Sequence, residues 1–376
     1  MLSRRRLLAA VPLLAPLKSA EIEAGFEPLF DGRTLAGWQV REGPSSAFYV
    51  EDGSIVVHRS SNYPTWLSTT RTFENFDLRL EFFLKGWSDS GIFFHAPEHG
   101  PPSAAGFKIN IFHQRDETPK PESMGSIFPI VPPRLVNVRS QGDWNTMRVL
   151  MDWPLLRVWV NGEIVQDLDL EAHAELRHRL RSGYIGLESL SYPVRFRNLR
   201  IRPLPPKENW QVLYERPEDF SKNWFVSEGE PKFEPLGEVL YGDGSGHIAT
   251  KEKFRDFELQ LYVRADRFHN SGVLFRSAGQ GLKGSRYEIQ LHNVPEAHYP
   301  TGSLYYHKRA SYPRIRDFEW FLMQLWVKGP TCLVRINGET VLEYDRLENL
   351  EAGHIELQAH RPGKWTEFKR VRIKPL

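Results

Sequence analysis

Three short segments in the C-terminal half of the chain alternate apolar side chains with side chains that exchange protons or donate hydrogen bonds. These segments are Gly272–Arg276, Tyr287–His292 and Ile355–His360. A period of two is that of a β-strand with one buried face, so the polar members are expected to share the outer face of one sheet. They are Arg276, Glu288, Gln290, His292, Glu356, Gln358 and His360. A carboxylate, a guanidinium, amides and imidazoles on one face indicate general acid–base chemistry; a solvated outer sheet face is the alternative for each residue.

Several other chemistries are excluded by what the sequence lacks. It contains no glycine-rich phosphate loop that leads from a strand into an expected helix, no His-Glu-x-x-His and no Gly-x-Ser-x-Gly. It also lacks the Glu-x-Asp-x-Glu strand with which laminarinase-type jelly rolls place paired carboxylates across a glycosidic bond. His95 and His99 have an i,i+4 spacing, but Pro97 between them prevents a helical metal pair. No metal and no cofactor are therefore expected.

The net charge and the cysteine content limit which ligands, metals and cross-links are expected. The 376 residues carry a formal net charge of +2, which offers no field to hold nucleic acid phosphates. The single cysteine, Cys332, excludes an internal disulfide and a multi-thiolate zinc site. Because Cys332 alternates with Leu333 and Arg335 on the same side as Val334 and Ile336, we expect a buried, inert thiol.

The N-terminus is typical of an export signal. Residues 1–20 contain three arginines, Arg4 to Arg6, followed by an apolar stretch from Leu7 to Leu17 that is too short to span a membrane. The order Ser-Arg-Arg-x-Leu-Leu resembles the bacterial twin-arginine signal; an ordinary secretory signal is the alternative. We expect cleavage after Ala20, a periplasmic or extracellular protein, and no integral membrane segment.

The remaining chain contains one pattern written twice. Phe76–Leu80 matches Phe257–Leu261, and Ser90–Phe94 matches Ser271–Phe275 at the same offset. Further matches follow in the same order, up to a closing Pro-Leu in both copies. The join at Pro203–Lys207 is a short, stiff spacer. We therefore expect two domains, 26–204 and 208–376, called here the first and second copy.

Both copies are expected to be all-β. Their apolar residues have a period of two, and Asn161-Gly162 and Asn337-Gly338 each separate two alternating runs, which is a strong hairpin signal. Only Glu171–Arg181 is expected to form a short helix. Many short strands in about 170–180 residues indicate two tandem jelly-roll β-sandwiches.

The second copy is the better candidate for chemistry. At the aligned positions of the first copy, the residues are different in character: His95 for Arg276, Lys108 for Glu288, Asn110 for Gln290, Phe112 for His292 and Glu188 for Gln358. The first copy thus loses the acid and the arginine from the face. It is expected to bind a ligand, to complete the other site or to give support only.

Several motifs, in this order along the chain, resemble the 3-keto-disaccharide hydrolase domain family, also described as 3-keto-glucoside 1,2-lyase or 3-keto-2-hydroxyglucal hydratase. They are Phe30–Trp38, Asp143–Asn145, Phe196–Ile201, Asn270–Arg276, Tyr287–Gln290, Thr301–Tyr305 and Ile355–His360. The chain departs from the family at Asn293 and His113, where the family often has Asp. The resemblance covers nearly all of the chain after the signal, in two copies, and implies a concanavalin-like jelly roll.

The resemblance also implies a reaction. A ketone at C3 of a sugar acidifies the proton on C2; a base removes it, the C1 oxygen leaves, and water adds to complete net hydrolysis. Glu288 or His292 is then the candidate base, and Arg276 with Gln290 the candidate pair at the enolate oxygen. His360 is the candidate acid, and Gln290, Asn270, Tyr305 and Gln358 are expected to bind the substrate, an oligosaccharide or 3-keto-sugar.

Two other function classes stay open at this point. The chain is compatible with a non-catalytic, lectin-like carbohydrate-binding protein, and with a laminin-G-like adhesion module. A binding protein needs exposed aromatic side chains but no titrating group, so the set Arg276, Glu288, Gln290 and His360 is the sequence feature that discriminates between the classes. The sequence does not determine the linkage, the aglycone or the oligomeric state.

Overall fold

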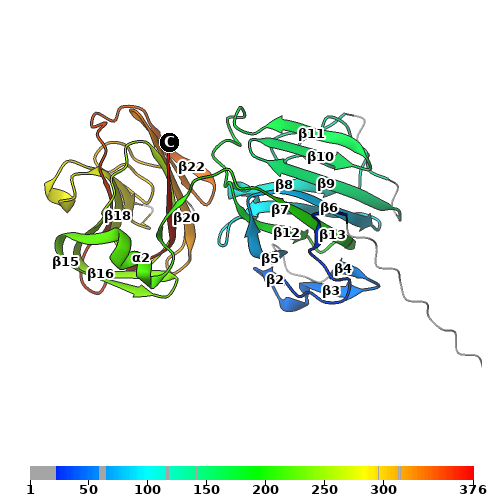
Figure 1. Ribbon diagram of the computed structural model, residues 1–376, viewed down its shortest axis with the longest axis horizontal. Coiled ribbons are helices and arrows are strands. Elements are labelled where there is room, and N and C mark those ends of the chain that lie inside the picture. Colours follow the sequence, from blue (N-terminus) through cyan, green and yellow to red (C-terminus); the bar gives the residue numbers. More distant parts are fainter. Residues whose placement is uncertain are drawn as a thin grey trace, which may run out of the picture.

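The computed structural model describes residues 23–58, 65–115, 118–139, 142–294, 296–311, 313 and 315–376. The expected export signal, residues 1–20, lies outside the described residues. The two copies form two β-sandwiches that lie side by side (Figure 1). No helix among the described residues is long and apolar enough to cross a membrane.

The first copy consists of two facing sheets. One sheet has, in spatial order, β11 (Glu163–Asp169), β10 (Leu155–Val160), β9 (Trp144–Asp152), β6 (Asn75–Leu84), β13 (Val194–Leu204), β4 (Ser54–Val57) and β3 (Phe48–Glu51), with β1 (Glu27–Pro28) also paired to β13. The other has β2 (Trp38–Arg41), β5 (Thr65–Phe73), β12 (Gly183–Ser189), β7 (Asp89–Ala96) and β8 (Phe107–Phe112). The short elements are η1 (Ser45–Ala47) and α1 (Pro102–Ala105).

In the second copy one long strand joins the two layers. The sheet order is β19 (Tyr287–Leu291), β18 (Ser271–Ser277), β23 (His354–Ala359), β16 (Val239–Thr250), β24 (Thr366–Pro375), β17 (Phe257–Ala265), β20 (Phe321–Lys328), β21 (Thr331–Ile336) and β22 (Glu339–Tyr344). In addition, β14 (Gln211–Tyr214) pairs with β24, and β15 (Trp224–Leu236) pairs with β16. The first half of β16 pairs with β24 and its second half with β23. The remaining elements are α2 (Pro217–Asn223) and η2 (Gly281–Lys283).

Each copy has its own apolar core, built from the alternate residues of its strands. Cys332 is buried in the second core with Val334 and Ile336, which confirms the expectation for this thiol. Both Asn-Gly pairs have positive φ at both residues and connect hairpin strands, β10 to β11 and β21 to β22, as predicted. The all-β jelly-roll prediction is confirmed.

The helix expected over Glu171–Arg181 is wrong, because this segment forms a succession of turns. Its backbone carbonyls are engaged by side chains of other elements: Leu180 O contacts the His95 ring at 2.9 Å, and His178 O accepts from Gln324 at 3.1 Å and from Arg335. These contacts replace the i→i+4 bonds that a helix needs.

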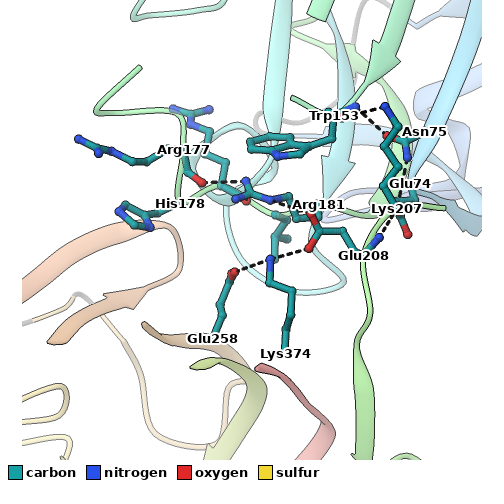
Figure 2. A network of polar contacts seen from close by, with 12 residues as sticks. Glu74, Asn75, Trp153, Arg177, His178, Arg181, Lys207, Glu208, Glu258 and Lys374 are labelled. Carbon is teal, nitrogen blue, oxygen red and sulfur yellow. Dashed lines mark hydrogen bonds and ion pairs between the residues drawn. The ribbon is translucent and has the colours of Figure 1, made fainter. Parts of the chain in front are cut away.

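Charged side chains connect the two copies. Glu208, just after the spacer, contacts Arg181 Nε at 3.5 Å and Lys374 Nζ at 2.5 Å, and Lys374 Nζ also lies 3.3 Å from Glu258 (Figure 2). The guanidinium of Arg181 lies over the ring of Trp153. The segment containing Arg181 therefore contacts the outer side of the sheet that includes β17 and β24.

Candidate active site

Strand register in the second copy places the candidate polar residues on one sheet face. Gln290 lies opposite Gly272, and Glu288 opposite Leu274, in the β18–β19 pair. Gln358 lies opposite His247 in the β16–β23 pair. The intervening residues Val273, Ile289 and Leu357 are in the core. The period-two argument therefore holds for β19 and β23.

Gly272 leaves room for the acidic side chain at the centre of this face. A Cβ on Gly272 would be 2.4 Å from Glu288 Oε1, so the carboxyl group of Glu288 lies over this glycine. The two ends of the Gln290 amide lie 3.1 Å from Glu288 Oε1 and 3.1 Å from Asn270 Oδ1. We call the set Asn270, Gly272, Glu288, Gln290, Gln358 and His247 the Glu288 face.

Glu288 is an acid in an environment that favours its neutral form. Its residue is 7% exposed. Burial raises the pKa of Glu288 to about 7, and Arg286 opposes this shift only in part. A carboxyl group with a pKa near neutrality accepts and returns protons at physiological pH, which is the property that a general base requires.

Behind the face, a chain of contacts orients Gln358. Its Nε2 lies 3.0 Å from His247 Nε2, and His247 Nδ1 lies 3.3 Å from Glu228 Oε2. Burial lowers the pKa of His247, so the ring is neutral and its Nε2 accepts from the amide. The carbonyl oxygen of Gln358 is then left buried and without a partner among the described residues.

His247 and Glu228 were missed by the sequence reasoning. The signal for His247 was present, because it alternates with Ile248 in β16 as Gln358 does with Leu357. Glu228 sits next to a register shift in the β15–β16 pair, where strict alternation no longer predicts direction. Glu356, on the same strand as Gln358, is fully buried and accepts from Ser227 and Ser277, so its role is structural.

Two histidines follow the ends of the two strands. His292 comes directly after β19 and is half-buried, while His360 comes directly after β23 and is exposed. Burial first, and then the positive charge of His360, lower the pKa of His292. Burial also lowers the pKa of His360. Both shifts favour the neutral form of the ring, which is the form that accepts a proton.

An aromatic cluster borders Glu288 on its other side. The Tyr305 amide donates to Glu288 O at 2.9 Å. The Tyr305 ring packs against Tyr299 and Tyr306, with centroids 5.2 and 4.2 Å apart. Hydrogen bonding to Tyr306, then burial, raise the pKa of Tyr305. Tyr306 is 76% exposed, so the cluster presents aromatic surface to a ligand.

The prediction that Arg276 shares this face is wrong. A register shift between Leu274 and Ser277 breaks the alternation, and Arg276 has a φ of 47°. Its fully buried guanidinium donates to Arg255 O, Asn349 O and Asp256 Oδ1 at 3.0–3.1 Å. All three nitrogens are therefore engaged in holding loops to the bulged strand.

In the first copy an ion pair occupies the equivalent place. Lys108 Nζ lies 2.6 Å from Glu188 Oε2, and a Cβ on Gly91 would be 2.5 Å from Lys108 Cε. Gly91 pairs with Asn110 as Gly272 pairs with Gln290. In the second copy, the acid over the glycine forms no ion pair with a described residue, whereas the first copy holds a neutralised pair at this place.

Metal chemistry has no obvious donor set here: within the described parts of the chain, no group of three or more His, Cys, Asp or Glu residues is arranged to hold a metal ion.

Comparison with known proteins identifies a family for this chain and several solved structures of low sequence identity. The profile of the 3-keto-alpha-glucoside-1,2-lyase-like domain family matches residues 25–202 and again 208–374. No curated protein matches the chain. A candidate glycosyl hydrolase from Parabacteroides distasonis is 20% identical over 48% of this chain and 94% of its own, with a TM-score of 0.43. Carbohydrate-binding module CBM66 from Bacillus subtilis is 13% identical over 40% and 95%, with a TM-score of 0.29. A lichenase from a mouse hindgut metagenome is 13% identical over 44% and 98%, with a TM-score of 0.33.

Proposed function

Because the chain belongs to the 3-keto-alpha-glucoside-1,2-lyase-like domain family, we propose that its second copy cleaves 3-keto-glycosides at the Glu288 face. The observation that carries this proposal is the buried carboxyl group of Glu288, which forms no ion pair with a described residue and has its pKa raised to about 7. Binding of a neutral sugar does not require a carboxyl group that titrates near neutrality, whereas abstraction of a proton does.

The proposed reaction begins at C2 of the sugar. The ketone at C3 makes the C2 proton acidic, and Glu288 takes this proton while the electron pair moves toward the ketone oxygen. The C1–O bond then breaks, a C1=C2 double bond forms, and the departing oxygen takes a proton from the imidazolium form of His292 or His360, which becomes neutral. Addition of water across the double bond gives the free 3-keto-sugar and completes net hydrolysis. His292 is the alternative base.

The amides of the face supply the hydrogen bonds. The Gln290 and Asn270 amides lie beside Glu288 and are proposed to donate to the developing enolate oxygen. Gln358 presents an unpartnered oxygen and is proposed to orient a hydroxyl group. Tyr305, with its aromatic neighbours, is proposed to pack against a sugar ring. Arg276 has no part in this scheme, because its donors are already engaged.

The decisive experiment is Glu288→Gln in the full chain with a 3-keto-disaccharide as substrate. The change preserves size and hydrogen bonding but removes the base, so kcat is expected to fall roughly 10²–10⁴-fold with little change in substrate binding. Lys108→Gln, at the equivalent position of the first copy, is the matched control and is expected to leave kcat unchanged. Full activity of Glu288→Gln would transfer the assignment to a carbohydrate-binding module.

We also propose that the protein is exported. The basic and apolar pattern of residues 1–20 supports this. The intact mass of the mature protein is expected to correspond to a chain that lacks this segment, and a mass that retains Met1 would contradict the proposal.

A further inference from the structure

A large groove lies between the two copies, away from the Glu288 face. Its volume is about 1220 Å³, and both copies contribute to its walls. The first copy provides Arg41, Trp66, Phe93 and Glu188, which lie on strands β2, β5, β7 and β12. The second copy provides Phe318 and Trp320, just before β20. The groove therefore covers the sheet face of the first copy that corresponds to the Glu288 face.

Polar atoms at the base of this groove lack partners among the described residues. Trp66 is 2% exposed, and its indole Nε1 is buried and has no such hydrogen-bond partner. Arg41 donates to Glu98 O at 2.9 Å through one nitrogen, while its Nε is buried and has no such partner. A buried N–H without an acceptor destabilises the fold. Two such donors in the wall of one groove indicate a ligand that carries hydrogen-bond acceptors.

The charge of the groove does not favour an anionic ligand. Its described lining includes five glutamates and two arginines, and three further cations neutralise two of these glutamates: Lys108 pairs with Glu188, and Lys369 and Arg370 pair with Glu98. The groove therefore has no excess of positive charge with which to hold an acidic polysaccharide or a nucleic acid. A neutral ligand with many hydroxyl groups satisfies both the donors and the carboxylate acceptors.

The dimensions and aromatic content define the ligand further. Pockets for small molecules have volumes of roughly 300–1,000 Å³, so this groove accommodates more than a single small molecule. Phe318 is 53% exposed at the groove and offers an apolar surface to a sugar ring. The size of the groove, the exposed ring of Phe318 and the unpartnered donors together fit a chain of several sugar units.

We propose that this groove binds a neutral oligosaccharide without cleaving it. The proposal goes beyond the function assigned to the Glu288 face. Cleavage is not expected here, because the carboxylate of Glu188 is held at 2.6 Å by Lys108 and offers no free base. The groove would hold a glycan chain in place while the second copy acts on its own substrate.

The two walls are held together by contacts that do not involve the ligand. Lys369 Nζ and Arg370 Nε, from β24, lie 2.9 and 3.0 Å from the carboxylate of Glu98 in the first copy. Arg181 of the first copy, whose Nε lies 3.5 Å from Glu208, joins the copies at another point (Figure 2). The groove therefore exists before the ligand arrives, and its test requires the full chain.

Isothermal titration of the full chain with neutral gluco-oligosaccharides of two to six units tests the proposal. Affinity is expected to rise with chain length. Trp66→Phe removes the N–H donor, and Phe318→Ala removes the apolar surface, so each is expected to weaken binding by about three- to tenfold. Phe268→Ala is the matched control, since Phe268 is 59% exposed but belongs to the second copy and does not line the groove.

Several results would overturn the proposal. They are unchanged affinity in both groove variants, tighter binding of an oligogalacturonate than of the neutral series, and no binding at millimolar ligand. Loss of binding in Gly272→Ala with retention in Trp66→Phe would place the ligand on the Glu288 face instead. The melting temperature of each variant is measured beside its titration, to show that the variant is folded. If Trp66→Phe unfolds, Phe318→Ala still tests the proposal, because Phe318 is exposed and its replacement leaves the core intact. Full turnover by Glu288→Gln would refute the proposed reaction and leave this binding result unaffected.

Discussion

The carboxyl group of Glu288 lies over the Cα of Gly272, at the place where any other residue would carry its side chain. A Cβ at this position would be 2.4 Å from Oε1, a distance that real Cβ contacts do not reach. The backbone of Gly272 has an ordinary strand conformation that any residue can adopt. Glycine is therefore needed here because its lack of a side chain leaves room for the Glu288 carboxyl group.

Gly272→Ala is therefore expected to displace the Glu288 carboxylate while the strand remains intact. A misplacement of about 1 Å at a reacting group costs about 10²-fold in rate, so kcat for a 3-keto-disaccharide should fall by this order with a smaller change in KM. Steady-state kinetics at pH 7.5 measures both parameters.

The first copy offers a matched control for this change. Gly91→Ala brings a Cβ to 2.5 Å from Lys108 Cε and creates the same crowding beside a residue without a catalytic role. Its kcat is expected to be that of the wild type. Equal losses in the two variants would mean that the crowding disturbs the fold and not the base.

The raised pKa of Glu288 also predicts a pH dependence of stability. In the unfolded chain this carboxyl ionises near 4.5, and in the folded chain near 7. Between these values the folded state binds more protons, so the free energy of unfolding falls as pH rises, by at most about 3 kcal/mol in total. Glu288→Gln removes this cost: its urea midpoint should exceed that of the wild type at pH 8 and equal it near pH 4.

Lys108→Gln is expected to change the stability at pH 8 in the opposite direction. It breaks a buried ion pair and leaves Glu188 without its partner, so the variant should be less stable than the wild type at pH 8. Glu288→Gln could also prove less stable than the wild type at pH 8. The carboxylate of Glu288 would then have a stabilising partner in the fold, and its assignment as a base with a raised pKa would fail.

Arg276 and His95 show that the repeat extends to a detail that alternation could not predict. Both have positive φ, of 47° and 49°, in equivalent bulged strands. Arg276 donates to Arg255 O, and the His95 ring contacts Glu74 O, which is the equivalent residue at the same offset. Each also contacts a backbone carbonyl in the loop that precedes the strand paired with the bulged strand: Asn349 O before β23, and Leu180 O before β12.

Arg276→Met is therefore expected to destabilise the protein without disabling the proposed chemistry. Loss of three hydrogen bonds, one of them to Asp256, should lower the free energy of unfolding by about 2–4 kcal/mol. At temperatures where the variant is folded, kcat should match the wild type. Arg276→Lys should recover part of the stability, and a selective loss of kcat in either variant would return Arg276 to the reaction.

The sequence predicted the sheet face of some site residues correctly and of others incorrectly, and the difference has a physical reason. Glu288, Gln290 and Gln358 lie in regular strands, where a period of two fixes the face. Arg276 lies in a bulge and Glu228 beside one, and a bulge reverses the expected direction. The groove between the copies depends on how two sandwiches pack, which no strand pattern contains.

The two copies are predicted to separate into independently folding units, with catalysis confined to the second. Their cores are distinct, and the residues of the Glu288 face all follow the spacer. The surface that contacts the first copy includes Glu258, Arg335 and Lys374, which remain compatible with water when exposed. A chain that starts within Pro203–Lys207 should therefore be soluble, melt cooperatively and retain kcat for a 3-keto-disaccharide. It should also lose the binding of longer neutral glycans, because Trp66 and Arg41 are gone. An insoluble product would contradict the prediction of independent folding, and a soluble product without turnover would mean that the first copy completes the active site.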